Sequence, residues 1–220
     1  MPLFHSILTG VAMGDGRVHT ALKRANVERD VGLKAIDELC QLGIIRKEKQ
    51  KKEFTNWAEN ESISDKLYFS SPFLRFWFAF VSPLFKGIKE GNYTEIKKRY
   101  QNRESEFVQL PFVELSQEFL KQSFLDDKIV QCSSYWDNKN EIDIYAKTKS
   151  GKIVVGTCKY TNTKIKKSEL SKLQEKCKES GISADIFVIF SKNGFSKELK
   201  SLKNENLKLY TVKNLKQVVS

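Results

Sequence analysis

The sequence has few residues of the kinds that build disulfide frameworks, metal sites or membrane spans. Its four cysteines (Cys40, Cys132, Cys158 and Cys177) form no Cys-x-x-Cys pair, and only two histidines accompany them. This excludes the usual zinc-ligand spacings and indicates a reducing compartment, the cytoplasm. No run approaches the roughly 18 apolar residues of a membrane span, and no basic-then-apolar signal pattern begins the chain. We therefore expect neither a membrane protein nor an exported one.

Two further absences concern nucleotides and base recognition. The pattern G-x-x-x-x-G-K-[ST] does not occur, so the sequence shows no ATP site. From residue 106 onward there are 20 lysines against 14 acidic residues, and there is no arginine. Arginine reads guanine edges with two hydrogen bonds, whereas lysine is a point charge suited to phosphates. Any DNA contact from this half is therefore expected to follow the backbone more than the base sequence.

What the sequence does have is a core-forming composition and an excess of positive charge. Its 220 residues are 40% hydrophobic and 11% aromatic, enough for one large globular domain or two small ones. The net charge is +11, with 18 basic against 13 acidic residues up to residue 105 and 20 against 14 after it. An excess shared by both halves favours nucleic acid as the partner; lysines that serve only solubility are the alternative.

Residues 1–55 have the pattern of a winged helix-turn-helix. A short basic helix over 22–27 precedes a second helix from Leu33, which Gly43 is placed to end. A basic, hairpin-like segment follows over 46–53. This order predicts a DNA-binding module, with protein docking as the alternative. The candidate DNA-contacting residues are Arg29, Lys34, Arg46, Lys47, Lys49, Lys51 and Lys52.

Residues 56–105 are expected to form an aromatic-rich helical connector. The run from Tyr68 to Val81 is dense in aromatic residues, with Arg75 as its single charge, and Pro83 follows it. We interpret the run as a buried helix, because aromatics that stack nucleic-acid bases usually have basic neighbours on an exposed sheet. A platform for bases is the alternative.

Residues 106–220 are expected to alternate helix and strand as a layered α/β domain. A helix over 107–125 carries an apolar stripe of Phe112, Leu115, Phe119 and Leu120. The order α-β-β-β-α-β, with additions at its end, defines the predicted fold class, α/β. The elements after the first helix are expected at about 128–135, 140–147, 152–160, 166–180, 185–190, 196–203, 207–210 and from 213.

Two of these strands place polar residues on one face. Asp143 alternates with apolar neighbours in one strand, and Thr157 and Lys159 do so in the next. A hairpin centred on residues 150–151 sets Asp143 opposite Thr157 and Glu141 opposite Lys159.

These residues resemble the motif of the PD-(D/E)XK restriction-endonuclease-like superfamily. E-I-D at 141–143 and the lysine of G-T-C-K-Y match it, and the preceding helix offers Glu114 or Glu118 as a first carboxylate. The resemblance implies Asp143, Lys159 and Glu114 as catalytic residues. Asp143 and Glu114 would hold Mg²⁺ for phosphodiester hydrolysis.

One residue departs from this motif. Thr157 stands where the family has glutamate, and a neutral hydroxyl holds Mg²⁺ far more weakly than a carboxylate does. The sequence therefore predicts a degenerate nuclease site.

More narrowly, the chain resembles the C-terminal part of the archaeal and bacterial AAA-type ATPase family. The matching segments are LYFSSPFLRFWFAFVSP, FVELSQEFL, YWDNKNEIDIYA, VVGTCKY and FSKNGFSKEL. The resemblance implies a winged helix followed by a nuclease-like domain, without the family's ATPase part and with an AAA-type ATPase as a partner.

We therefore expect a DNA-binding protein whose second half holds phosphates through lysines, with Lys164, Lys166 and Lys167 as further candidates. Two alternatives stay open: an active Mg²⁺-dependent DNA endonuclease, and a non-catalytic interaction module that works with a separate ATPase.

Overall fold

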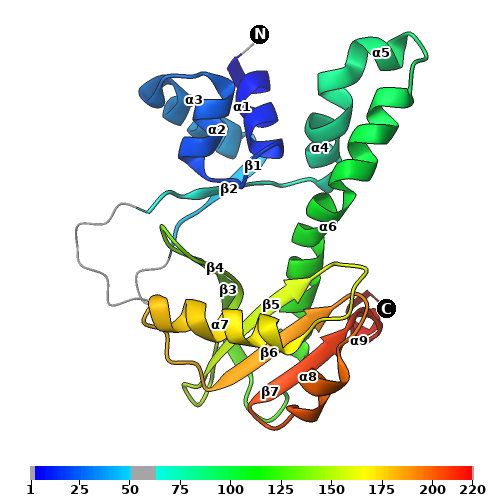
Figure 1. The fold of residues 1–220 in the computed structure, drawn as a ribbon. Helices are drawn as coiled ribbons and strands as arrows, with labels where there is room; N and C mark the ends of the chain where they lie inside the picture. Colours follow the sequence, from blue (N-terminus) through cyan, green and yellow to red (C-terminus); the bar gives the residue numbers. More distant parts are fainter. Residues whose placement is uncertain (1–2, 51–62, 220) are drawn as a thin grey trace. The chain divides into compact units, whose positions relative to one another are not determined.

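The computed structural model describes residues 3–50 and 63–219, and the chain divides into two compact units (Figure 1). The first unit contains the described residues up to 103, and the second begins at residue 104. Helix α6 (Thr94–Ser123) begins in the first unit and ends in the second. Both segments 1–55 and 56–105, expected as separate parts, contribute to the first unit. The chain is mixed α/β, with helices near its N-terminus and a five-stranded sheet in its second half.

The first unit begins with three helices and a two-stranded antiparallel ribbon. The helices are α1 (Leu3–Ala12), α2 (Val18–Ala25) and α3 (Arg29–Gln41), and β1 (Ile45–Glu48) pairs with β2 (Lys66–Phe69). Apolar residues from each element form a core because helical spacing aligns them on one side. The largest fully buried side chains among them are Ile7, Ile36, Leu39, Ile45 and Leu67.

Helix α3 ends at the glycine that the sequence indicates. Gly43 has φ +68° and its amide donates to Cys40 O, while the Ile44 amide donates to Leu39 O over 3.1 Å. A glycine in the left-handed region closes a helix in this way because it carries no Cβ to clash.

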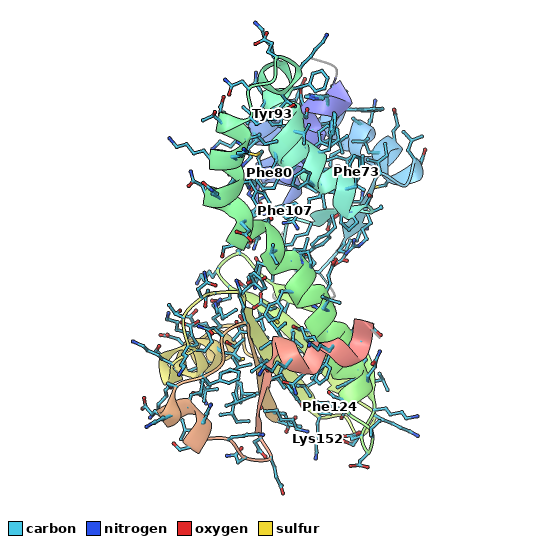
Figure 2. The ribbon with its side chains drawn as sticks, turned by 90° about the vertical axis from the view of Figure 1, so that its right-hand side faces the viewer. Phe73, Phe80, Tyr93, Phe107, Phe124 and Lys152 are labelled. Atoms are coloured by element: carbon cyan, nitrogen blue, oxygen red, sulfur yellow. The ribbon has the colours of Figure 1, made fainter. Side chains whose placement is uncertain are left out.

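The aromatic run does not form the single buried helix predicted for it. Its first residues belong to β2, and it continues through α4 (Pro72–Phe76) and a π-helix (Trp77–Val81). A 3-10 turn (Ser82–Leu84) and α5 (Phe85–Lys89) follow the run. Prolines at the first turns of α4 and of the 3-10 segment start new elements, since proline is tolerated there and breaks a helix elsewhere. Phe80 is fully buried, but Phe73 is 66% exposed (Figure 2).

The second unit is built on a five-stranded mixed sheet in the order β3-β4-β5-β6-β7. Its strands are β3 (Ile129–Trp136), β4 (Glu141–Thr148), β5 (Ile153–Lys159), β6 (Ile186–Ser191) and β7 (Leu207–Thr211). The first three run antiparallel, and β5, β6 and β7 run parallel. All five strands that the sequence predicts are present, and none of their ends is shifted by more than one residue.

Helices cover both faces of this sheet (Figure 1). Along β5, Val154 and Cys158 pack with the buried residues of α6, while Val155 packs with Leu173 and Cys177 of α7 (Lys167–Glu179). Successive side chains of a strand point to opposite faces, so α6 and α7 lie on opposite sides. Two short helices complete the unit: α8 (Lys197–Ser201) and α9 (Val212–Val219).

Helix α6 is longer than the predicted helix over 107–125. It begins at Thr94 and continues through Pro111, a residue that removes one backbone donor. Phe112, Phe119 and Leu120 are buried as the stripe predicts, but Leu115 is exposed. The predicted helix began only at Phe107 because apolar residues are sparse in the turns from Thr94 to Glu106.

Candidate functional site

The hairpin of β4 and β5 brings Asp143 and Thr157 together. The pairs Ile144–Gly156 and Tyr145–Val155 lie in the predicted register. Thr157 Oγ1 donates to Asp143 Oδ2 over 3.0 Å, and the backbone N–H of Cys158 donates to the same oxygen over 2.7 Å. The prediction that Asp143 faces Thr157 is therefore confirmed.

The environment of Asp143 both penalises its charge and fixes its position. Burial raises the pKa of the Asp143 carboxyl, while the donors from Cys158 and Thr157 and the charge of Lys159 act in the opposite direction. Thr157 is itself buried. The Thr157 hydroxyl thus serves as a hydrogen-bond donor to Asp143.

Lys159 is paired with a carboxylate that the sequence interpretation missed. Its Nζ lies 3.3 Å from Glu169 Oε2 at the start of α7, and Glu169 Oε1 lies 2.7 Å from Lys172 Nζ. Burial opposes ionisation of Glu169, but its two lysine partners outweigh that effect and lower its pKa. The sequence signal for Glu169 was its position in the first turn of the helix that follows β5, because acidic residues are favoured at helix N-termini.

The predicted first carboxylate, Glu114, does not join this group. It is an exposed residue of α6, and α6 covers the face of the sheet opposite to α7. Besides its apolar residues, α6 contacts the strands through two amide side chains. Gln117 Nε2 donates to Asp143 O over 2.8 Å, and Gln109 bonds both Cys158 O and Tyr160 N. The sequence placed a helix before the strands but did not say which of its residues face them.

These side chains do not fit the Mg²⁺ that the family resemblance implies. One oxygen of Asp143 already accepts two hydrogen bonds, and Glu169 is held by two ammonium groups. Over residues 3–50 and 63–219, no three His, Cys, Asp or Glu side chains gather as a metal-binding group. Mg²⁺ requires oxygen ligands with near-octahedral geometry, which an amide-lined, lysine-paired arrangement does not provide.

Lysines gather instead on two loops at the carboxyl ends of β5 and β6. The loops, residues 159–167 and 192–197, are called the lysine loops below. They contain no aspartate or glutamate. Their lysines are Lys159, Lys164, Lys166, Lys167, Lys192 and Lys197.

Backbone contacts hold the two lysine loops side by side. Ile165 N donates to Gly194 O over 2.9 Å, and Ser196 N donates to Ile165 O over 2.9 Å. Lys192 N donates to Lys159 O, and the Lys192 ammonium lies 4.3 Å from the centre of the Tyr160 ring. The carboxyl ends of parallel strands are the usual place for ligand sites in α/β sheets.

The lysines of these loops differ in their freedom to meet a ligand. Lys159 is tied to Glu169, and Lys167 Nζ lies 3.7 Å from Glu198. Lys164, Lys166, Lys192 and Lys197 are exposed. The predicted candidates Lys164 and Lys166 therefore lie on a surface where they can meet an anion, together with Lys192, which the sequence interpretation did not select.

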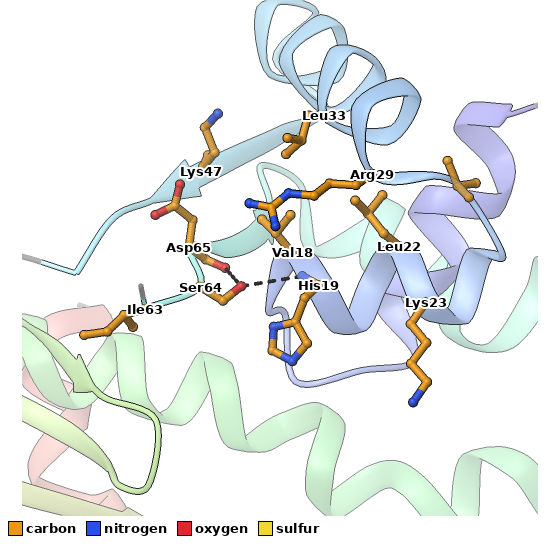
Figure 3. Close-up of a pocket in the computed structure, with 11 residues that line it drawn as sticks. Val18, His19, Leu22, Lys23, Arg29, Leu33, Lys47, Ile63, Ser64 and Asp65 are labelled. Carbon is orange, nitrogen blue, oxygen red and sulfur yellow. Dashed lines mark hydrogen bonds between the residues drawn. The ribbon is translucent and has the colours of Figure 1, made fainter. Parts of the chain in front are cut away.

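In the first unit, two predicted DNA-contacting residues line one cavity of about 570 Å³ (Figure 3). Arg29 reaches it from the start of α3, and Lys47 from β1. His19, whose amide donates to Ser64 Oγ, lies at its rim with Lys23. The cavity therefore collects basic side chains between α2, α3 and the ribbon.

The other predicted contacts of this unit are dispersed. Lys47 Nζ is 2.7 Å from Asp37, which raises the pKa of Lys47 through their hydrogen bond. Arg46 pairs with Glu48 at 3.3 Å and stacks over Tyr68. Lys34 and Lys49 are exposed. Lys51 and Lys52 lie outside the described residues.

Within the described part of the chain, none of the helices combines the length and apolar character that crossing a membrane requires. No curated protein matches the sequence. Among solved structures, "Crystal Structure of Protein of Unknown Function AF1548" aligns over 50% of this chain and 66% of its own, at 20% identity and TM-score 0.36.

A second solved structure is a "half-complex from tetradecameric assembly of Thermococcus gammatolerans McrB AAA+ hexamers with bound McrC". It aligns over 99% of this chain at 14% identity and TM-score 0.32. The chain spans about half of that structure's chain, 51%. At these TM-scores neither similarity defines the fold, and the AAA-type ATPase partner stays a prediction.

One sequence family matches part of the chain. It is DUF234, "Archaea bacterial proteins of unknown function", and the match covers residues 77–173, from the π-helix to the middle of α7. This segment, less than half of the chain, is therefore similar to the DUF234 domain.

Proposed function

We propose that this protein binds DNA through lysine contacts to phosphates and that its second unit does not cleave the DNA it holds. In this proposal the first unit is a winged helix and the second a nuclease-like domain whose catalytic site has degenerated. The observation that carries the binding is the pair of lysine loops. Four of their six lysines, Lys164, Lys166, Lys192 and Lys197, are exposed, whereas Lys159 and Lys167 are paired with Glu169 and Glu198.

Charge and chemistry favour a polyphosphate backbone as the ligand. Lysine ammonium groups bind phosphates as point charges, and each contact releases a counterion from the duplex. The second unit contains no arginine from residue 106 onward, so the proposal gives it little base readout. Arg29 and Lys47, which line the cavity of the first unit, add phosphate contacts there.

The side chains around Asp143 disfavour cleavage of DNA. Thr157 and the Cys158 amide occupy one oxygen of that carboxylate, and Lys159 is bound to Glu169. A nuclease of this class needs carboxylates that converge on a metal and a lysine available to the reacting phosphate. The contacts around Asp143 support a domain that keeps the nuclease-like strands but lacks the converging carboxylates and the available lysine.

The test is a salt titration of DNA binding by the full chain. Anisotropy of a labelled 30-base-pair duplex is measured between 50 and 200 mM salt for the wild type and for the triple variant Lys164→Ala, Lys166→Ala, Lys192→Ala. Each lost phosphate contact lowers the slope of log K against log salt by about 0.9. We expect the triple variant to bind at least tenfold more weakly at 50 mM salt, with a slope reduced by two to three such steps.

A matched control removes the same charge at the other end of the sheet. Lys128, Lys149 and Lys152 are exposed and lie near the turn between β4 and β5. Their combined replacement by alanine is expected to leave the slope nearly unchanged. Equal loss in both variants would mean that net charge alone is responsible, and no binding by the wild type at 50 mM salt would refute the proposal.

A further inference from the structure

Three aromatic rings form a contiguous, partly exposed cluster in the first unit. Phe73 of α4 and Phe85 of α5 are 66% and 51% exposed, and the half-buried Trp77 lies between them. The ring centres of Phe73 and Trp77 are 6.3 Å apart, and those of Trp77 and Phe85 are 6.1 Å apart. These three residues are called the aromatic patch. Phe73 is labelled in Figure 2 beside the buried Phe80.

The backbone at the centre of the patch is unusual. Trp77 begins the π-helix, and Ser82 N donates to Trp77 O, a bond five residues apart. Hydrogen bonds of this spacing are rare, and π-helical turns are frequently found at functional sites. In this protein the wider turn lies beside an exposed cluster of rings. The exposed rings do not contribute to the core of the unit.

We propose that the aromatic patch is a docking surface for an acidic amphipathic helix of another protein. Tryptophan flanked by other large rings is the composition of protein-binding hot spots, and contiguous exposed rings are uncommon on monomers. Phe73 and Trp77, four residues apart, together with Phe85 on the other side of Trp77, offer a surface on which one apolar stripe of a helix can lie.

The charge around the patch selects the partner. Lys86 and Lys89 are exposed on α5, the helix that carries Phe85, and the exposed Glu90 that follows α5 is the one acidic residue from Lys66 to Thr94. An apolar helix with acidic flanks therefore complements both the rings and their rim. A second copy of this chain fits less well, because it would bring another +11 net charge against the same basic rim.

Nucleic-acid bases also fit the rings less well. The angle between the ring planes is 38° for Phe73 and Trp77 and 50° for Trp77 and Phe85. Part of the surface of each ring is in contact with its neighbour. Bases stack best on flat, separately exposed rings that follow one another along a basic groove.

The test uses the full chain and a defined probe. The probe is a fluorescein-labelled 16-residue peptide with leucines at helical positions i, i+3, i+4 and i+7 and glutamates on its other faces. Two comparison peptides have the same composition in scrambled order, or lysine in place of glutamate. We expect the wild type to bind the probe at least tenfold more tightly than either comparison peptide.

Variants of the chain then locate the surface. Phe73→Ser with Phe85→Ser is expected to weaken probe binding at least tenfold, while Leu42→Ser, at an apolar residue 64% exposed outside the patch, leaves it unchanged. Circular dichroism checks that each variant is folded; if the double variant unfolds, Phe73→Ser alone serves with an expected fivefold loss.

Four outcomes would overturn the proposal. They are equal affinity for the scrambled peptide, probe binding that the Phe73 and Phe85 variants do not alter, binding of a dT20 oligonucleotide but not of the probe through the patch, and a dimer in sedimentation that the double variant abolishes. DNA binding through the lysine loops is measured separately and does not depend on this result.

Discussion

Lys159 at the end of β5 and Glu169 at the start of α7 form an ion pair, with Nζ 3.3 Å from Oε2. The first lysine loop connects β5 directly to α7. The Glu169 carboxylate at the start of α7 therefore restrains Lys159 at the end of β5. Glu169 also holds Lys172 at 2.7 Å. Two ammonium groups are thereby withheld from any phosphate that approaches this edge of the sheet.

Replacing this carboxylate is expected to strengthen DNA binding. Glu169→Gln frees Lys159 and Lys172, and each that reaches a phosphate steepens the salt slope by about 0.9. We expect three- to tenfold tighter binding of a duplex at 50 mM salt. Glu205→Gln makes the same charge change at an exposed residue between α8 and β7 and is expected to have a smaller effect. Equal gains in the two variants would show that the pairing with Lys159 plays no part.

The hydroxyl of Thr157 is expected to matter for stability. Thr157→Ala removes the hydrogen bond from the buried Thr157 hydroxyl to the half-buried Asp143 carboxylate. Hydrogen bonds to charged groups contribute about 1.5–3 kcal/mol, so we expect the free energy of unfolding in urea to fall by that amount. Thr157→Ser keeps the hydroxyl and is expected to lose less than half as much. The interpretation fails if the serine and alanine variants are equally unstable.

Addition of a divalent metal is expected to leave DNA intact. Supercoiled plasmid incubated with the purified chain and Mg²⁺ or Mn²⁺ should show no nicking above a protein-free control on agarose gels. The reason is the donor set, since the Asp143 carboxylate is held by Thr157 and Cys158. Metal-dependent cutting that Asp143→Ala abolishes would contradict the expectation and establish the endonuclease instead.

Asp137 lies at the centre of a buried polar network at the turn after β3. It is 5% exposed and accepts hydrogen bonds from Tyr135 Oη at 2.9 Å, Ser180 Oγ at 2.7 Å and the backbone amides of Lys139 and Asn140. Burial opposes its charge, but these donors outweigh burial and lower the pKa of Asp137.

The sign of this shift predicts a loss of stability in acid. A carboxyl with a folded-state pKa below its unfolded value, near 3.9, stabilises the fold above that value and ceases to as the pH falls through the folded pKa. We expect Asp137→Asn to lower the free energy of unfolding by about 2 kcal/mol at pH 7. The difference between wild type and variant should shrink below pH 4. A difference that stays constant from pH 6 to pH 3 would show that Asp137 does not titrate in this way.

The sequence by itself determined the local elements of this protein. Alternation and turn residues placed all five strands of the second unit and the register of β4 with β5, because a two-residue period and a short turn leave few choices. Gly43, with positive φ, marked the end of α3 for the same local reason. The aromatic run failed this approach, since hydrophobicity without a period does not separate strand, α-helix and π-helix.

Only the tertiary structure decided which helix residues meet the polar residues of these strands. Glu114 was a reasonable carboxylate in sequence, but α6 covers the face of the sheet away from α7, and Glu169 pairs with Lys159 instead. The face that a helix covers depends on chain connection and packing between layers, which no local pattern specifies. The same packing set the two lysine loops side by side and left Phe73 and Phe85 at the surface.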